Sequence, residues 1–206
     1  MILNKKAIGA CMIASQDTLR PALACVKIEE KRMIGADGYK MIIIERNTEV
    51  NNFNHEDLPN MGTVVKNEEY LLNASQLKVA LQRIPKKTDL PILKNIWTIE
   101  SERDNQVKVI STDLSSNSID YIEKCDANYP NVDIIIPTSE PIATISFSIP
   151  YMIELLKAID IAGAKETSSI VTVEIHDKLA PIMLRSIDSN KNKITGLLMP
   201  VRVENR

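Results

Sequence analysis

The 206-residue sequence is poor in aromatic residues, histidine and cysteine, and it has no long apolar run. Aromatic residues make up 4% of the chain, with one Trp and two Phe. The three cysteines, Cys11, Cys25 and Cys125, are widely spaced and form no CxxC pair, as a zinc site or redox motif would require. They are typical of small core residues in a reducing compartment. No segment approaches the roughly 18 apolar residues of a membrane span, so the sequence predicts a cytoplasmic protein without a membrane partner.

Motifs of the common catalytic sites are also absent from the sequence. The two histidines, His55 and His176, are far apart, and neither has the spacing of a metal ligand. There is no Walker loop, GxSxG elbow or HExxH motif. Asp37, Asp113 and Asp177 are better explained as turn residues than as general acids or bases. We therefore expect no enzyme activity and no metal or other cofactor, although a catalytic cluster assembled only in space stays open.

Apolar periodicity divides the chain into three similar cycles, each a helix followed by three strands. The helices are expected over residues 4–14, from 73 or 75 to about 84, and from 150 to about 163. The strands expected after them are 22–29, 32–36 and 39–46; 95–100, 106–112 and 116–123; and 170–175, 181–187 and 194–203. Short strands at 69–72 and 144–149 precede the second and third helices, and 47–66 is expected to be a loop. Repetition at about 70 residues indicates an α+β fold of stacked supersecondary units.

The last expected strand, 194–203, departs from the alternation of a half-buried strand. Residues 197–201 are all apolar, and among them Pro200 lacks the N–H that a sheet ladder needs. One interpretation is that another element of the same chain covers both faces. The other is that Leu197, Leu198, Met199 and Val201 line a pocket for an apolar partner. The sequence leaves both interpretations open.

Basic residues gather on one side of the first two expected helices. This side lies opposite or beside the apolar stripe of each helix. The basic residues concerned are Lys5, Lys6, Lys78, Arg83 and Lys86, and the neutral, polar Gln82 lies on the same side. Such a face can contact phosphates without reading bases, and a solvated helix face is the alternative. The net charge of −2 excludes only a uniformly basic nucleic-acid binder.

Three stretches together resemble the bacterial sliding clamp family, the beta subunit of DNA polymerase III. They are 16–23 (QDTLRPAL), 35–41 (GADGYKM) and 198–203 (LMPVRV). Residues 129–131 (YPN) and 147–158 resemble that family's connector and the start of its last helix. By this resemblance residues 1–137 correspond to the clamp's middle domain, in two half-domain units of about 1–60 and 61–137. Residues 143–206 correspond to the second half of its C-terminal domain. The resemblance implies the DNA-clamp fold, with three repeats of one helix followed by three antiparallel strands.

The resemblance also implies a function in DNA replication, as a processivity factor for DNA polymerase. In the family, helices line a ring around duplex DNA, and a pocket near the C-terminus binds short peptides of polymerases and other clients. The matching pocket residues here are Leu23, Ala36, Gly38, Tyr39, Lys40, Met41, Pro130, Ile134, Ile135, Leu197, Leu198, Met199, Pro200, Val201 and Arg202. The implied DNA-facing residues are Lys5, Lys6, Arg20, Lys78, Gln82, Arg83 and Lys86. Ile134 stands where the family often has a basic residue, which changes the expected preference for clients.

The number of units bears on how a ring would close. A family protomer of six half-domain units closes as a dimer, so a chain with three units predicts a homo-tetramer if the ring is kept. The alternative is a clamp-derived adaptor or decoy that binds client peptides without encircling DNA. The expected partners are thus duplex DNA bound without sequence preference, client peptides, and further copies of the chain.

Overall fold

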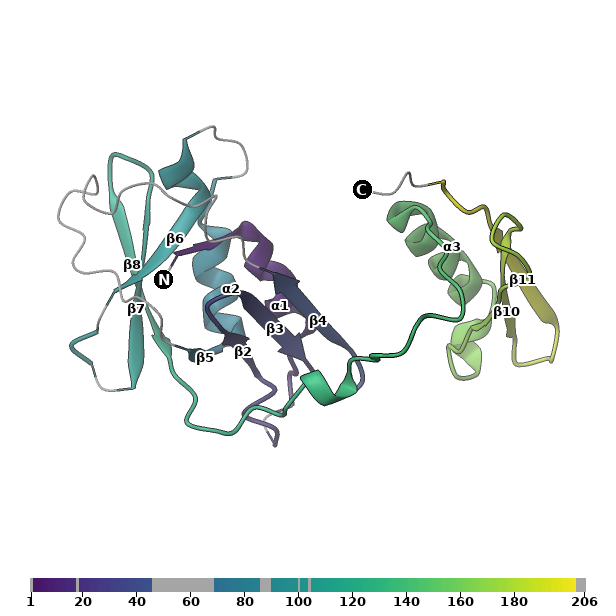
Figure 1. Cartoon of the computed structure of the whole chain (residues 1–206), viewed down its shortest axis with the longest axis horizontal. Helices are drawn as coiled ribbons and strands as arrows, with labels where there is room; N and C mark the ends of the chain where they lie inside the picture. Colours follow the sequence, from purple (N-terminus) through teal and green to yellow (C-terminus); the bar gives the residue numbers. More distant parts are fainter. Residues whose placement is uncertain are drawn as a thin grey trace. The chain divides into compact units, whose positions relative to one another are not determined.

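The computed structural model describes residues 2–17, 19–45, 69–85, 90–99, 101–103 and 105–202. The chain forms two compact units, Met1–Ile135 and Ile136–Arg206, drawn in Figure 1. The loop expected at 47–66, including His55, lies outside the described residues, as do Lys86 and Val203.

Unit 1, Met1–Ile135, contains two modules of the expected kind. The first has β1 (Ile2–Asn4), a 3-10 turn η1 (Lys5–Ala7), α1 (Ile8–Ile13), β2 (Cys25–Ile28), β3 (Arg32–Ala36) and β4 (Met41–Glu45). The second has β5 (Tyr70–Asn73), α2 (Ala74–Gln82), η3 (Pro91–Lys94), β6 (Asn95–Ile99), β7 (Gln106–Thr112) and β8 (Asn117–Glu123). The turn η4 (Asp133–Ile135) ends the unit. The sequence of one helix followed by three strands is confirmed in both modules.

The two modules of unit 1 exchange the short strand that precedes each helix. The sheets have the orders β4-β3-β2-β5 and β1-β6-β7-β8. In the first, Leu72 of β5 is antiparallel to Val26 of β2, and in the second Leu3 of β1 is antiparallel to Ile96 of β6. The strand β1 was not expected from the sequence, because its partner β6 lies about 90 residues further along the chain and local patterning does not record such a pairing.

A single core joins the modules, and α1 packs against α2 within it. Leu3, Leu72, Leu77 and Leu81 are all fully buried in this core. The start of α2 is set by Asn73, whose side-chain oxygen accepts the backbone N–H groups of Ser75 and Gln76 at 3.1 Å. Apolar burial from two helices and two sheets therefore stabilises unit 1 as one body.

Unit 2, Ile136–Arg206, contains one module. It has α3 (Ile149–Ile161), the turn η5 (Ala164–Glu166), β9 (Thr172–Glu174), β10 (Ile182–Ile187) and β11 (Lys193–Leu198). The sheet order is β11-β10-β9, and α3 covers one face of it (Figure 1). The helix lies close to β11, since a Cβ built at Gly196 would be 3.0 Å from the Cδ1 atoms of Ile159 and Leu155. The third cycle of one helix and three strands is thereby confirmed.

Three local expectations for unit 2 are corrected by the structure. Residues 144–148 form no strand in the described chain, and β11 ends at Leu198 rather than at 203. Beyond it the backbone N–H of Val201 donates to Ser146 O at 2.8 Å, while Pro200 has no N–H to continue the ladder. The apolar spacing of α3 also predicts a buried stripe of Met152, Leu155, Leu156 and Ile159. Leu156 is exposed, however, and Ile159 is the residue of that stripe that is fully covered.

Two kinds of feature are absent from the described residues. No helix among them has both the length and the apolar character to cross a membrane. No group of three or more His, Cys, Asp or Glu side chains in the described ranges is placed to hold a metal ion.

Two of the three cysteines lie in the core, as expected for small apolar residues. Cys11 and Cys25 are buried, Cys125 is half-buried, and all three are free thiols. Burial raises the pKa of the Cys11 thiol to about 12, and burial together with the neighbouring Cys125 raises the pKa of Cys25 to about 12. Thiolate is the reactive form, so both thiols should resist alkylation at pH 8.

This resistance gives a simple test of the core. Mass spectrometry after iodoacetamide treatment of the native chain should find Cys11 and Cys25 unmodified, whereas urea-unfolded chain should be modified at all three cysteines. Rapid native alkylation of Cys11 would contradict the packing of α1.

Candidate functional site

The turn between β3 and β4 is held in place by Asp37. Its carboxylate accepts the backbone N–H groups of Tyr39 at 2.8 Å and Lys40 at 2.9 Å, and it pairs with the Lys40 ammonium. These contacts, the Lys40 side chain first, lower the pKa of Asp37 to about 2. Gly38 sits at φ 97°, a conformation that favours glycine. The turn therefore presents Tyr39, which is almost fully exposed, on a fixed backbone.

A hollow lies between this turn and the segment that follows α1. Its volume is about 360 Å³, and its lining is formed by Met12, Ala14, Ser15, Gln16, Asp17, Arg20, Asp37, Tyr39 and Lys40. Exposed apolar surface from Met12 and Tyr39 stands beside charged Arg20 and Lys40. This mixture of apolar surface and a few charged groups suits a short peptide segment.

The structure brings several of the expected pocket residues of unit 1 to this hollow. Tyr39 and Lys40 line it, and a Cβ built at Gly38 would lie 2.7 Å from Arg20 Nη1 and 4.0 Å from Leu23 Cδ1. Met41 is half-buried at the start of β4. Ala36 is buried in the core, so its expected place on the pocket surface is corrected: its side chain stabilises the sheet.

The lining also includes residues that the sequence did not assign to a pocket. Met12, Ala14, Ser15, Gln16 and Asp17 come from the end of α1 and the loop after it. Part of this loop, 16–23, was recognised as a motif, which is the signal that could have found them. The sequence alone did not show that this loop lies close to the β3–β4 hairpin, about 20 residues further along the chain.

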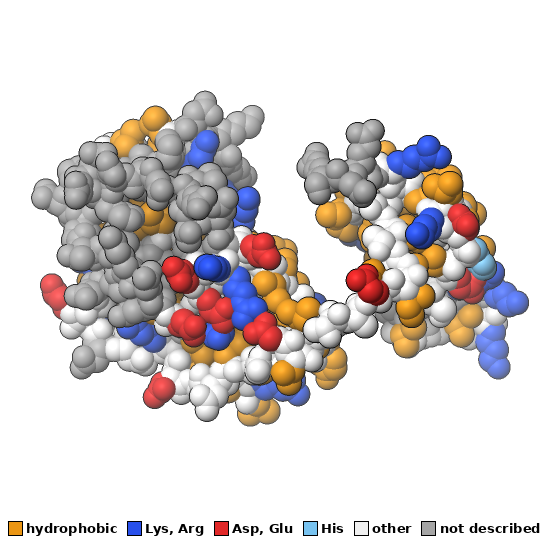
Figure 2. All heavy atoms as spheres, viewed as in Figure 1, with side chains coloured by type: hydrophobic (Ala, Val, Ile, Leu, Met, Phe, Trp, Pro, Cys, Tyr) orange, Lys and Arg blue, Asp and Glu red, His pale blue; other side chains and the backbone are white. Residues whose placement is uncertain are grey.

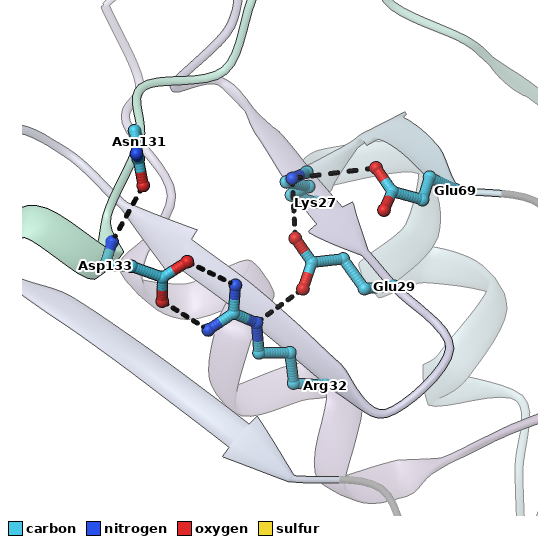
Figure 3. Close-up of polar contacts among 6 residues, drawn as sticks. All are labelled: Lys27, Glu29, Arg32, Glu69, Asn131 and Asp133. Carbon is cyan, nitrogen blue, oxygen red and sulfur yellow. Dashed lines mark hydrogen bonds and ion pairs between the residues drawn. The ribbon is translucent and has the colours of Figure 1, made fainter.

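The connector that ends unit 1 is anchored by charged contacts (Figure 3). The guanidinium of Arg32 on β3 binds both carboxylate oxygens of Asp133, at 2.6 and 2.9 Å, and also contacts Glu29, which pairs with Lys27. The hydrogen bonds from Arg32 hold the pKa values of Asp133 and Glu29 below their usual range.

The anchored connector displays apolar side chains. Val132 is buried, and burial raises the pKa of the Tyr129 phenol to about 12. Ile134 and Ile135, in the turn η4, are exposed, and so is Pro130. These three residues of the expected pocket are therefore accessible on unit 1.

In unit 2 the expected pocket residues divide between surface and core. Leu197, Met199, Val201 and Arg202 are exposed and Pro200 is half-buried. Leu198 is buried in a cluster with Ile159, Ile182 and Leu184. The interpretation that the chain covers its own terminal strand is thus correct for Leu198, and its assignment to an open pocket is corrected.

The basic residues expected to face DNA fall into two groups. Lys5 Nζ donates to Ile84 O at 3.0 Å, and Arg83 pairs with Asp120 of β8 at 2.8 Å. Lys6 and Gln82 are exposed and Lys78 is half-buried. Arg20 lies at the hollow, 3.8 Å from Asp17. Three of the expected side chains, those of Lys5, Arg20 and Arg83, therefore have partners within unit 1, and the solvated part of the face is smaller than the sequence indicated.

The chain is similar to known proteins in its structure. No family model matches the sequence, and no curated protein matches it. A beta chain of DNA polymerase III from Streptococcus pneumoniae TIGR4 matches 100% of this chain and 50% of its own, with 17% identity and a TM-score of 0.67. A DNA polymerase sliding clamp from Bacillus subtilis matches with the same shares, 12% identity and a TM-score of 0.71. The beta subunit of DNA polymerase from Streptococcus pyogenes matches 98% of this chain and 50% of its own, with 17% identity and a TM-score of 0.64. The chain spans about half the length of the solved structures it matches.

Proposed function

We propose that this chain, whose fold is that of the bacterial DNA polymerase III beta sliding clamps, is a non-catalytic processivity factor for DNA polymerase. In this function it tethers client proteins to duplex DNA in the cytoplasm and binds their short peptide motifs. The observation that supports the proposal most is the match of the whole chain to clamp structures. A fold alone does not fix a function, so the sites carry the rest of the argument.

The proposed client-binding residues are presented separately by the two units. Unit 1 offers the hollow with Met12, Tyr39 and Arg20 on its lining and the exposed Ile134 and Ile135 on its connector. Unit 2 offers Leu197, Met199 and Val201, all exposed next to the end of β11. Apolar anchors of a client peptide would supply most of the binding energy, and Arg20, Lys40 and Arg202 would select its polar ends.

The proposed DNA contact rests on Lys6, Lys78 and Gln82, which lie on η1 and α2 and form no ion pair within the described part of the chain. Because these groups would bind phosphates, affinity should fall steeply with salt. The engagement of Lys5 and Arg83 with partners inside unit 1 favours a second candidate, a non-encircling adaptor or decoy that binds client peptides only.

Binding to a closed circular plasmid and to the same plasmid after linearisation separates the two candidates. For a clamp, we expect the protein to remain on the circle and to slide off the linear form, and we expect the double variant Lys6→Glu with Lys78→Glu to reduce the slope of log affinity against log salt by about 2. The matched control is Lys31→Glu with Lys193→Glu, which reverses two exposed charges in the β2–β3 turn and on β11. Equal slopes for the two double variants would contradict the assigned DNA face, and the absence of retention on either plasmid form would favour the adaptor.

A further inference from the structure

Unit 2 repeats the backbone geometry of one module of unit 1. In unit 1 the N–H of Cys125, just after β8, donates to Leu71 O of β5 at 2.8 Å. In unit 2 the N–H of Val201, just after β11, donates to Ser146 O at 2.8 Å. Ser146 precedes α3 as Leu71 precedes α2. Residues 145–148 of unit 2 are therefore placed against their own module as β5 is placed against its own.

The other edge of β5 pairs with a strand, and the equivalent segment of unit 2 has no such partner strand in the described chain. In unit 1 that edge pairs with β2, from Cys25 opposite Asn73 to Ile28 opposite Tyr70. In unit 2 the first strand after the helix is β9, and the sheet of the described chain ends there. Unit 2 thus has counterparts of both partners in the exchange seen in unit 1: the segment 145–148, which occupies the place of β5 but forms no strand, and an edge strand that could receive it.

Apolar side chains at the corresponding places are buried in unit 1 and exposed in unit 2. Ala74 and Leu81 of α2 are buried, whereas Ile149 and Leu156, which stand at the same positions of α3, are 70% and 39% exposed. Ile153 lies between them on the same stripe of α3 and is 48% exposed.

The edge strand shows the same contrast. On β2, Val26 and Ile28 are fully buried, while Val173 of β9 is 55% exposed although it lies opposite the buried Leu184. Figure 2 shows hydrophobic side chains reaching the surface of unit 2. An exposed apolar helix stripe and an open strand edge in one small unit are both features of an interface.

We propose that a second copy of this chain covers this face of unit 2. In the pair, α3 packs against α3 of the partner, and residues 145–148 of each copy pair with β9 of the other. A two-fold axis satisfies both copies at once, because each chain carries the donated segment and the receiving edge. A second copy fits this face because two modules of the same chain already pair by this exchange in unit 1.

Light scattering on a sizing column, with the full chain and without DNA, tests the pairing. We expect the wild-type mass to be an even multiple of 23.1 kDa. The single variants Ile153→Glu and Val173→Lys should each halve that mass, because each places a charge in the apolar interface between the two copies. Both side chains are exposed in the unpaired chain, so the fold should persist, which circular dichroism would verify. Hydrogen exchange at 145–148 and β9 should slow with rising protein concentration in the wild type and not in the variants.

The matched control is Val79→Glu, a similar change at an exposed position of α2, whose counterpart in α3 is already Glu154. Its mass should equal that of the wild type. An oligomer whose mass is the same in wild type, Ile153→Glu and Val173→Lys would overturn the pairing and leave the clamp proposal standing on other contacts. A wild-type monomer at all concentrations would overturn the pairing as well, and peptide binding could still be measured on that monomer. If a different protein bound this face of unit 2 while the pure chain stayed monomeric, that result would likewise count against a second copy.

Discussion

Replacing Gly35 by alanine should destabilise unit 1 by about 3 kcal/mol or more. Gly35 lies in β3 directly beneath α1, and a Cβ built there would be 2.1 Å from Ala10 O and 2.8 Å from the carbonyl carbon of Ala10. These are backbone atoms, so no side-chain rotation relieves the clash. The helix must move away from β3, which opens the core around Met33 and Cys11.

The single tryptophan makes this effect measurable for unit 1 alone. Trp97 is fully buried in β6, so its fluorescence during urea unfolding reports on this unit. We expect the midpoint of Gly35→Ala to fall by about 1 to 2 M urea. The control is Gly9→Ala in α1, where the Cβ would meet the end of the flexible Ile44 side chain at 3.3 Å and the helix gains about 1 kcal/mol in propensity. A Gly35→Ala midpoint equal to that of the wild type would show that α1 does not lie on β3 as described.

Met199→Asp should abolish most client binding while unit 2 stays folded. Met199 is 64% exposed beyond the end of β11, so the free chain tolerates a charge there. A bound client peptide would bury that charge without a partner, which should weaken binding by about 30-fold or more, the effect of losing a strong anchor residue. Fluorescence anisotropy with a labelled synthetic peptide from a clamp-binding segment of a DNA polymerase measures the change.

Leu198→Asp, one residue earlier, should act differently. Leu198 packs with Ile159 and Leu184, so an aspartate there should unfold unit 2, and circular dichroism would show the loss of α3. Leu179→Asp is the control for charge alone, since Leu179 is exposed to a similar degree between β9 and β10. Unchanged peptide affinity in Met199→Asp would remove unit 2 from the client site and leave the hollow of unit 1 to be tested through Arg20→Glu.

Local chemistry explains how far the sequence could predict the fold. The stripe of Leu77, Ala80 and Leu81 predicts α2, and Asn73 marks its first turn because its side chain caps two backbone N–H groups. Asp37 and Gly38 predict the β3–β4 turn for equally local reasons. The sequence predicted the position of the candidate site only in part. The turn at Asp37 and Gly38 was predicted, with Tyr39 and Lys40 expected at the start of the next strand. Met12 and Ser15, in contrast, reach the hollow through a contact between two separate loops.

Residues that failed the sequence expectations did so because their partners are distant in the chain. Lys5 and Arg83 read as free surface charges, and folding gives them Ile84 O and Asp120 as partners. Leu198 read as part of an open apolar run, and α3 covers it.

The sequence by itself determined the three cycles of one helix and three strands, the turns between them and the capped start of α2, because each depends on interactions within a few residues. Only the tertiary structure decided which sheet the short strands β1 and β5 join, which basic side chains remain in solvent, and which apolar residues of α3 and β9 lack cover in unit 2. These outcomes depend on contacts between segments up to about 90 residues apart. Their formation is set by burial in a shared core and by the pairing of strand edges, which no local pattern in the sequence specifies.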